Sequence, residues 1–507
     1  MFASVLSASG LQGKSKLLIS MCLMSILSLS ASAALSQTSL PPSVEAALTK
    51  AGIPSSAISV MVLPAESNTP TLAIGATTPM NPASTMKLLT TLIALEELGP
   101  TFRWKTQFLS DATLKKETLN GDLYLRGGGA PDISWDKISL MLRGLRNQGI
   151  RKINGDIVLD RTYFSPVRPD LGTLPFDDTP STYYNVIPDA LMVNSNILTF
   201  DIDTNGGSIK VQTTPPMAKV QIKNELNFDD RSCSEWDSKS RLPVIETNSK
   251  HQTTITLSGH VPQRCKLSMS LNILDRNLYI EHLIRQLWQE MDGVWNGNVK
   301  EGKTPLSASV LFERQSDTLA DIIKPINKRS DNSMARSVYL SLGAEFSDTK
   351  NYLTSAQAAE ARIRSWLSRR GINPDNLILD NGSGLSRTER ISALQMAQLL
   401  KLGVSSNWYA EFATSLPIVA IDGTMRKRLK DTPLEGRARI KTGTLKDATA
   451  IAGYVRDVQN QNWIVVAMVN HSDAGKARPA LDELIYWVAT GQTNQTNQTN
   501  IAPTTTP

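Results

Sequence analysis

The first candidate catalytic residues are a serine and a lysine three positions apart, in Ser84-Thr85-Met86-Lys87. They stand at the expected start of an apolar helix, where residues i and i+3 share a face. An amine buried on such a helix has a lowered pKa and can take the proton of the serine hydroxyl, which activates a nucleophile without histidine. Taken alone, the pair also fits a helix-capping serine beside a lysine that reaches to solvent.

A second candidate group is Ser330-Asp331-Asn332, which lies between two stretches of helical pattern. The hydroxyl and the carboxamide can enter one cleft, where Ser330 relays a proton and Asn332 holds a peptide carbonyl. The same residue types also cap helices. This segment by itself leaves both interpretations open.

A third candidate group, Lys441-Thr442-Gly443-Thr444, lies in an expected edge strand. A strand edge offers unpaired backbone groups to an extended peptide, and Gly443 allows that backbone to approach closely. Lys441 and a threonine hydroxyl can hold a carboxylate. A basic edge strand that prevents aggregation is the alternative.

The hydrophobic pattern predicts the elements that position these residues. A short helix and a strand are expected within 43–63, and a helix over 84–98 whose apolar residues cover most of its circumference. Three consecutive strands with short turns near the C-terminal end predict an antiparallel meander. The later helices are expected at 318–327, 333–342, 355–370, 394–402 and 481–488, and the meander strands at 438–442, 450–455 and 463–469.

The stretch from about 105 to 300 has a different pattern. Short β-type runs alternate there with turn clusters, which predicts a β-rich insert. Its clearest runs are 123–125, 157–159, 220–223 and 253–257. From Gln492 onward the chain is of low complexity.

Composition limits the class of protein. At roughly 150 residues per domain, 507 residues predict two to four domains. With 41% hydrophobic and 20% charged residues, the chain is neither disordered, collagenous nor a polytopic membrane protein. The net charge of +6 favours an anionic surface nearby. Because no basic stripe is interleaved with aromatic residues, nucleic acid is not an expected partner.

The first residues have the layout of a secretory signal. Lys14 and Lys16 precede an apolar run over 17–29, and Ala31-Ser32-Ala33 fits a cleavage site, so the mature chain is expected to begin at Ala34. An uncleaved membrane anchor is the alternative, although the run is shorter than the roughly 20 residues of a bilayer span. The expected location is the periplasm or the exterior.

The cysteines and histidines do not form a recognisable catalytic or metal-binding motif. Cys22 lies in the apolar run, whereas Cys233 and Cys265 are compatible with one disulfide in an oxidising compartment or with two free thiols. Neither cysteine has metal-ligand spacing. No cofactor and no metal site are expected, because the histidines are scattered at His251, His260, His282 and His471.

Occurring together and in this order, S-x-x-K, S-D-N and K-T-G are the signature of penicillin-binding proteins and class A β-lactamases. The long first interval leaves room for the β-rich insert, and over nearly the whole mature chain the sequence resembles the class C low-molecular-mass penicillin-binding proteins, which are D-alanyl-D-alanine carboxypeptidase/endopeptidases. Runs similar to the family's lie at 381–387, 415–424 and 121–132. The sequence departs from them at Asn381 and Ala130, where the family usually has Asp.

The resemblance implies an α+β fold of the penicillin-binding/β-lactamase-like type, an antiparallel sheet flanked by helices. It further implies a discontinuous DD-peptidase domain (34–105 and 306–490), interrupted by an insert of two β-rich subdomains (106–305). The signal peptide (1–33) and a low-complexity tail (491–507) complete the predicted organisation.

The resemblance also implies roles for the three motifs. Ser84 would form the acyl-enzyme, Lys87 would be its base, and Ser330 would relay a proton. Asn332 would bind the substrate amide and orient Lys87. The strand Lys441, Thr442, Gly443 and Thr444 would bind substrate, with Lys441 and Thr444 on the terminal carboxylate. The oxyanion hole would be the N–H groups of Ser84 and Thr444.

A further implied subsite would bind the free D-amino-acid end of the stem peptide's diamino acid. Asp178, Tyr183 and Arg387 would form it, because an acid and an arginine can pair with one zwitterionic centre. Asp178 fits a turn residue equally well. Lys446 stands where the family often has Gln, which leaves fine substrate preference open.

The sequence thus predicts an exported serine DD-peptidase that removes the terminal D-alanine from peptidoglycan stem peptides, cleaves D-alanyl cross-links and is acylated by β-lactams. A β-lactamase is the rival enzyme, disfavoured because no Glu-x-x-x-Asn run lies between Ser84 and Lys441. A non-catalytic wall-binding or β-lactam-sensing scaffold is the rival from another class. Peripheral attachment to membrane or wall stays open.

Overall fold

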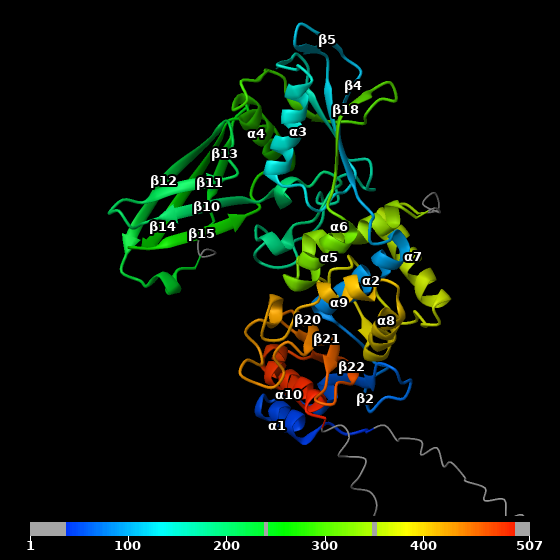
Figure 1. The fold of residues 1–507 in the computed structure, drawn as a ribbon. Coiled ribbons are helices and arrows are strands. Elements are labelled where there is room, and N and C mark those ends of the chain that lie inside the picture. Colours follow the sequence, from blue (N-terminus) through cyan, green and yellow to red (C-terminus); the bar gives the residue numbers. More distant parts are fainter. Residues whose placement is uncertain (1–36, 238–241, 347–351, 492–507) are drawn as a thin grey trace, which may run out of the picture. The chain divides into compact units, whose positions relative to one another are not determined.

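The computed structural model describes residues 37–237, 242–346 and 352–491 (Figure 1). The predicted signal peptide, its cleavage after Ala33 and residues 492–507 of the predicted tail lie outside the described residues. Within these ranges, none of the helices combines the length and the apolar character that a membrane span requires.

A five-stranded antiparallel sheet in the order β2-β1-β22-β21-β20 combines two strands from the N-terminal part of the described chain with three from its C-terminal part. The predicted meander is confirmed by its last three strands, and β20, which carries Lys441, lies at the edge as expected. Its strands are β1 (Ile58–Pro64), β2 (Leu72–Ile74), β20 (Ala438–Thr444), β21 (Ala448–Arg456) and β22 (Asn462–Asn470).

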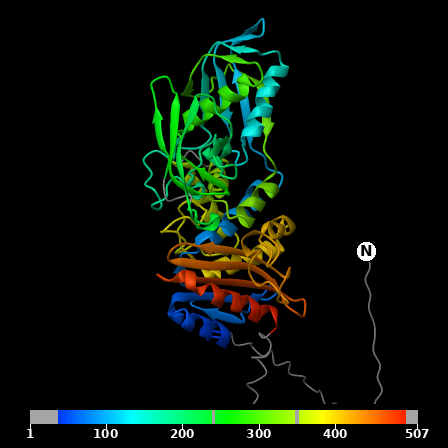
Figure 2. The same ribbon diagram turned by 90° about the vertical axis from the view of Figure 1, so that its left-hand side faces the viewer.

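Helices cover both faces of this sheet (Figure 2). On one face, α1 and α10 pack against β1, β21 and β22 around one apolar cluster. On the other face, α2 and α8 contribute to a second cluster. Because both faces are covered, side chains on both sides of the central strands are buried, and every residue from Ile58 to Leu63 is buried.

The predicted helices are all present with ends shifted by a few residues. The apolar helix expected over 84–98 is α2, preceded by a 3-10 turn, η2 (Ala83–Thr85), and its residues are buried up to Leu95. The sequence pattern missed α9, which is too short for its periodicity to be recognised. The helices are α1 (Pro42–Lys50), α2 (Met86–Leu98), α5 (Leu319–Lys328), α6 (Asn332–Ala344), α7 (Ser355–Arg369), α8 (Ala393–Ser405), α9 (Tyr409–Ser415) and α10 (Arg478–Ala489).

The stretch between α2 and α5 is rich in strands, as predicted. Its first two sheets have the orders β17-β9-β7-β4-β18 and β16-β8-β6-β5. Their strands are β4 (Lys105–Ser110), β5 (Thr113–Lys115), β6 (Thr118–Asn120), β7 (Leu123–Gly127), β8 (Lys152–Ile153), β9 (Ile157–Asp160), β16 (Val294–Trp295), β17 (Val299–Glu301) and β18 (Ser309–Gln315).

Two further sheets, in the orders β11-β10-β15 and β12-β14-β13, lie between β9 and α4. Their strands are β10 (Leu198–Asp203), β11 (Lys210–Thr214), β12 (Val220–Asp229), β13 (Val244–Thr247), β14 (Thr253–Pro262) and β15 (Lys266–Leu271). A two-residue pair, β3 (Pro79–Met80) with β19 (Ile391–Ser392), lies outside this stretch.

Two helices in this stretch, α3 (Trp135–Asn147) and α4 (Arg276–Gln289), were not predicted. The signal for α3 was present, because its buried residues recur at helical spacing from Ile138 to Leu145. β18 pairs with β4, so one sheet takes strands from both sides of the stretch. The domain boundaries themselves stay a prediction.

Cys233 and Cys265 form a disulfide, with their Cα atoms 5.8 Å apart. This resolves the choice between a disulfide and two free thiols. The bond ties the segment after β12 to the start of β15, and neither cysteine lines the cleft described below.

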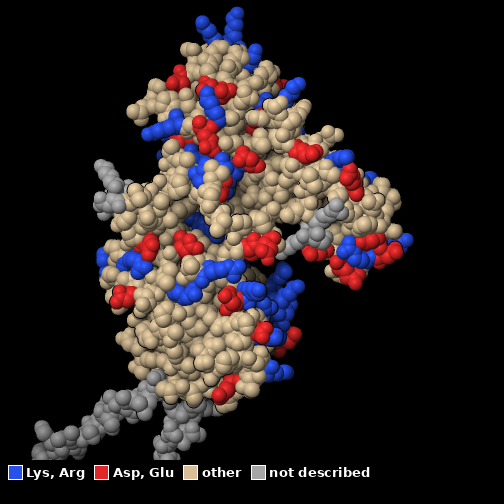
Figure 3. Space-filling view, turned by 180° about the vertical axis from the view of Figure 1, so that it is seen from behind, with Lys and Arg blue, Asp and Glu red and all other residues tan. Residues whose placement is uncertain are grey.

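Charged side chains of both signs are interspersed on the face seen in Figure 3, with one group of Lys and Arg side chains at the right-hand edge of its lower part. This distribution agrees with the modest net charge of +6.

Candidate active site

Ser84 lies in a constrained turn between β3 and α2. Ala83 adopts φ 44°, a conformation that costs free energy for a residue with a side chain, and strained residues of this kind cluster at functional sites. The Asn81 side chain supports the turn, because its Oδ1 accepts a hydrogen bond from the Ala83 N–H at 2.9 Å. Ser84 itself is half-buried.

Two glycines let neighbouring backbone reach this turn. A Cβ on Gly443 would lie 2.6 Å from the carbonyl oxygen of Pro82 and 2.9 Å from the nitrogen of Ser84. A Cβ on Gly384 would lie even closer to Ala83, and Gly384 also has a positive φ of 79°. Gly443, expected to admit a substrate backbone, thus already admits the backbone of the serine turn.

Lys87 is completely buried and does not reach to solvent. Its Nζ lies 3.0 Å from Ser84 Oγ and 2.6 Å from Asn332 Oδ1, and it also donates to the carbonyl oxygen of Ser383. The two carbonyl oxygens can only accept hydrogen bonds. A neutral amine has two N–H groups and one lone pair, so these two acceptors leave the lone pair for the hydroxyl of Ser84.

Burial lowers the pKa of Lys87 from 10.5 to about 7. The nearby Asp331 and Glu389 oppose that shift, whereas Arg336 adds to it. A lysine with this pKa is neutral in a large fraction of molecules near pH 7, as a general base requires. The alternative of a capping serine beside a solvated lysine is wrong for this chain, because Ser84 caps no helix and Lys87 is buried.

The second motif lies at the start of α6, and its three residues have three different structural roles. Asp331 is the N-cap, whose side chain accepts a hydrogen bond from the Met334 N–H at 2.9 Å. Asn332 is fixed from both ends, since its Oδ1 accepts from Lys87 and its Nδ2 donates to the Tyr184 carbonyl at 3.0 Å. Ser330 adopts φ 63°, a second strained residue at the site.

Lys441 connects the third motif to the second. It is fully buried in β20, and its Nζ donates to Ser330 Oγ at 2.9 Å and to the Thr442 carbonyl at 2.7 Å. Burial, reinforced by the charge of Lys87, lowers the pKa of Lys441 well below its usual value. Thr442 Oγ1 donates to Thr424 Oγ1 at 2.8 Å, and Thr444 is exposed. The structure therefore brings all three motifs together.

A cleft of about 920 Å³ opens over these residues. The side chains that were expected to bind the diamino acid all line it, and all three are exposed. They lie beside Ser84, Ser330, Asn332, Thr444 and Lys446, and they are Asp178, Tyr183 and Arg387.

The turn at 177–179 is held by Asp177 and not by Asp178. Asp177 accepts hydrogen bonds from the Thr179 N–H at 3.0 Å and from the Tyr184 hydroxyl at 2.8 Å. The guanidinium of Arg387 stacks on Phe176, the residue before Asp177, with its carbon 4.9 Å from the ring centre. Asp178 is thus left available to the cleft.

The sequence did not reveal two further groups that position Lys87, the Ser383 carbonyl and the Glu389 carboxylate. Ser383 acts through its backbone carbonyl, which no side-chain motif can reveal. Glu389 is fully buried, and its Oε1 accepts the N–H groups of Asp380, Asn381 and Gly382 at 3.3, 3.0 and 2.8 Å. Glu389 therefore fixes the loop that carries the Ser383 carbonyl. In the described part of the chain, no group of three or more His, Cys, Asp or Glu side chains could hold a metal ion.

Comparison with known proteins gives matches over most of the chain. The model of the D-Ala-D-Ala carboxypeptidase 3 (S13) family matches residues 40–490. The D-alanyl-D-alanine carboxypeptidase DacB of Haemophilus influenzae is 27% identical over 78% of this chain and 81% of its own length. The D-alanyl-D-alanine carboxypeptidase of Actinomadura sp. strain R39 is 26% identical over 80% of this chain and 76% of its own length.

A crystal structure of penicillin binding protein 4 (dacB) from Haemophilus influenzae has a similar fold. Its TM-score is 0.71 at 24% identity, over 87% of this chain and 99% of that chain. The likeness confirms the α+β fold of the penicillin-binding type that the three motifs predicted.

Proposed function

The chain belongs to the D-Ala-D-Ala carboxypeptidase 3 (S13) family, and from that premise we propose that Ser84 is its nucleophile and Lys87 the base. It is a serine-type D-Ala-D-Ala carboxypeptidase that acts on peptidoglycan and binds β-lactams. The observation that carries the assignment of residues is the position of Lys87, which is buried with its Nζ between two carbonyl acceptors and 3.0 Å from Ser84 Oγ.

In the proposed acylation, Lys87 Nζ takes the proton of Ser84 while Oγ attacks the carbonyl carbon of the D-Ala-D-Ala bond. The backbone N–H groups of Ser84 and Thr444 stabilise the negative oxygen of the tetrahedral intermediate. When the C–N bond breaks, the leaving nitrogen takes a proton from Lys87, relayed by Ser330. D-alanine leaves and the shortened peptide stays as an ester on Ser84.

Deacylation repeats these steps with water. Lys87 accepts a proton from the water that attacks the ester, and the proton returns to Ser84 Oγ when the C–O bond breaks. A β-lactam acylates the same serine, but its amine remains tethered to the acyl group after ring opening. The adduct is therefore long-lived.

Lys441 and Thr444 are proposed to hold the terminal carboxylate of the substrate. Burial and Lys87 disfavour the charged form of Lys441 in the free protein. An arriving carboxylate stabilises that charged form, since an opposite charge nearby raises the pKa of an amine. Substrate binding and protonation of Lys441 are thereby linked.

Asp178, Tyr183 and Arg387 are proposed to bind the diamino-acid end of the stem peptide. Their exposure in one cleft with Ser84 supports this, because an acid and an arginine can bind the ammonium and carboxylate of one centre. DD-endopeptidase activity needs the same acyl-enzyme and only a larger leaving amine, so we propose it as well. Export to the periplasm or the exterior rests on the predicted signal peptide and the disulfide.

Mass spectrometry after incubation with benzylpenicillin, followed by an assay of D-alanine release from a stem pentapeptide, tests the proposal. One stable penicilloyl adduct, absent from Ser84→Ala, with D-alanine release by the wild type, is the expected result. Rapid penicillin turnover without an adduct would identify a β-lactamase. Neither adduct nor turnover would identify a scaffold.

A further inference from the structure

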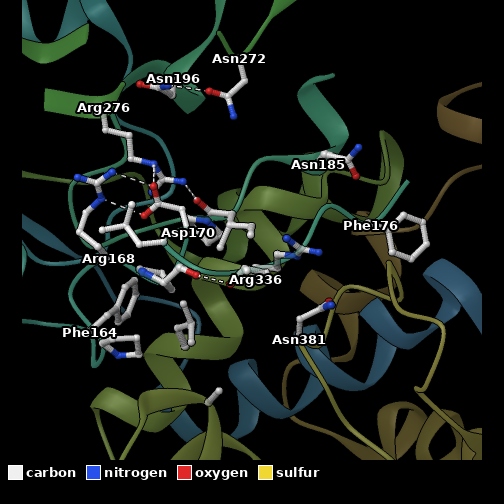
Figure 4. Close-up of a pocket in the computed structure, with 18 of the residues that line it drawn as sticks. Phe164, Arg168, Asp170, Phe176, Asn185, Asn196, Asn272, Arg276, Arg336 and Asn381 are labelled. Atoms are coloured by element: carbon white, nitrogen blue, oxygen red, sulfur yellow. Dashed lines mark hydrogen bonds and ion pairs between the residues drawn. The ribbon is translucent and has the colours of Figure 1, made fainter. Parts of the chain in front are cut away.

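A second cavity, of about 640 Å³, adjoins the catalytic cleft (Figure 4). The two hollows share four wall residues, Pro175, Phe176, Pro180 and Leu385. The other walls of the second cavity come mainly from the segment 164–176, the start of α4, α6 and the loop 380–385, with further residues within 185–188, 196, 272–274 and 354–356. This volume lies in the range of small-molecule sites in proteins.

Arg336 of α6 lines this cavity and is only 9% exposed. Its Nε has no hydrogen-bond partner among the described residues, and its Nη2 makes a long hydrogen bond of 3.4 Å to the Leu385 carbonyl. In the view of Figure 4, Arg168, Asp170 and Arg276 lie to one side of Arg336 and Phe176 to the other. Burial lowers the pKa of this guanidinium, and the more distant Asp380 and Glu389 oppose that shift.

Arg336 differs from the other buried arginines of the described chain, each of which forms an ion pair with a carboxylate. Those pairs are Arg161 with Asp189 at 3.0 Å, Arg276 with Asp189 at 2.8 Å, Arg285 with Glu281 at 2.9 Å and Arg362 with Glu97 at 2.9 Å. Arg336 has no such pair among the described residues. A buried charge without a partner is unfavourable, so the cavity beside it is suited to an anionic group.

The other residues that line the cavity indicate the chemical character of the rest of the ligand. Three carboxylates line the cavity, those of Asp170, Asp275 and Asp380. Asp170 is already paired with Arg168 at 2.9 Å and with Arg276 at 3.3 Å, and Asp275 lies 3.5 Å from Arg168. Asp380 forms no ion pair with Arg336 within 4 Å, so Arg336 keeps room for the carboxylate of a ligand. Apolar surface surrounds these groups, from Phe164, Leu171, Leu174, Phe176 and Tyr339. A ligand that fits carries one carboxylate on an apolar body.

We propose that this cavity binds an organic carboxylate, with Arg336 as its ion-pair partner. The cavity is placed to act together with the catalytic site. Asn332 and Arg336 stand one turn apart on α6, and the Leu385 carbonyl that Arg336 contacts is two residues from the Ser383 carbonyl that holds Lys87. The carboxylate can belong to the peptide bound in the cleft or to a separate small molecule.

Isothermal titration calorimetry with hippurate and its neutral amide, hippuramide, tests the proposal. The protein is first acylated with benzylpenicillin, so that the catalytic cleft is occupied. Hippurate is expected to bind at least tenfold more tightly than hippuramide, and Arg336→Gln is expected to abolish that preference. Arg336→Lys should keep part of it. Arg370→Gln, which changes an exposed arginine elsewhere, should keep it fully.

Equal binding of hippurate and hippuramide by the wild type would overturn the proposal, and so would an unchanged preference in Arg336→Gln. Because the wild-type comparison needs no variant, the test stands even where Arg336→Gln fails to fold. Circular dichroism melting shows whether it folds.

A second assay identifies the source of the carboxylate and rests on the proposed function. It compares D-alanine release from a D-Ala-D-Ala peptide with an N-terminal succinyl group, which carries a carboxylate, and from its N-acetyl counterpart. A higher kcat/KM for the succinyl peptide, lost in Arg336→Gln, assigns the carboxylate to the substrate. Equal kcat/KM values with hippurate binding intact assign it to a separate ligand.

The two proposals fail in different ways. If the wild type neither forms the penicilloyl adduct nor releases D-alanine, the proposed function is refuted. The titration of the unacylated protein with hippurate and hippuramide then still tests whether the cavity binds an organic carboxylate.

Discussion

If Lys87 is the base, as proposed, its pKa sets the pH dependence of acylation. Its pKa of about 7 leaves roughly half of the amines neutral at pH 7, whereas an amine with the ordinary value of 10.5 would be neutral in only about one molecule in three thousand. Since only the neutral amine can accept the proton of Ser84, the acylation rate should rise with pH through about 7. At pH 5 it should be roughly one hundredth of its plateau above pH 9.

The assay is stopped-flow or quenched acylation by benzylpenicillin, with the second-order rate constant measured from pH 5 to pH 10. Glu389→Gln should move the midpoint to lower pH, because the charge of Glu389 raises the pKa of Lys87 and the amide oxygen can still accept the loop N–H groups. Asp375→Asn, which removes an exposed carboxylate, should leave the midpoint unchanged. A rate at pH 5 within threefold of that at pH 9, or a midpoint above 9, would refute the reasoning.

Three further predictions concern the geometry around Ser84 and the disulfide. Asn332→Ala removes the acceptor that orients Lys87, so the acylation rate should fall by roughly a hundredfold while the circular dichroism spectrum stays native. Gly443→Ala places a Cβ against Pro82 and should slow acylation at least tenfold, whereas Gly475→Ala, with open space around it, should acylate normally in the same assay. The double variant C233A/C265A should lose about 3–4 kcal/mol in denaturant unfolding but keep its acylation rate, because the disulfide closes a loop between positions 32 apart and neither cysteine lines the cleft.

The sequence predicted the strands and helices that carry strong apolar patterns. The meander of β20, β21 and β22 could be predicted because three short β-type runs follow one another with only short turns between them. The buried α2 could be predicted because apolar residues cover most of its circumference over several helical turns. α9 could not be predicted, since seven residues give too few turns for a period to show. The pairing of β18 with β4 is a contact between distant parts of the chain, which local patterns do not encode.

The candidate site divides in the same way. The order of the three motifs predicted Ser84, Lys87, Ser330, Asn332 and Lys441 as candidate site residues, because this chemistry needs particular side chains at fixed local spacings. The spacing of the motifs could not predict the burial, the pKa or the hydrogen-bond partners of those side chains. Whether Lys87 is buried or solvated depends on what packs around it, and that is set by residues hundreds of positions away in the chain.

What the sequence by itself determined about this protein is therefore its family and its reaction, and it named Ser84, Lys87, Ser330, Asn332 and Lys441 as the candidates for the reactive side chains. Only the tertiary structure decided that Lys87 is fully buried and donates hydrogen bonds to the Asn332 and Ser383 oxygens. It also decided that Asp177, rather than Asp178, accepts the hydrogen bonds of the turn. It alone also revealed that Arg336 is a buried cation without a carboxylate partner among the described residues. The physical reason is that pKa, desolvation and pairing are properties of an environment assembled from distant segments, whereas a motif records only the residue types that the chemistry requires.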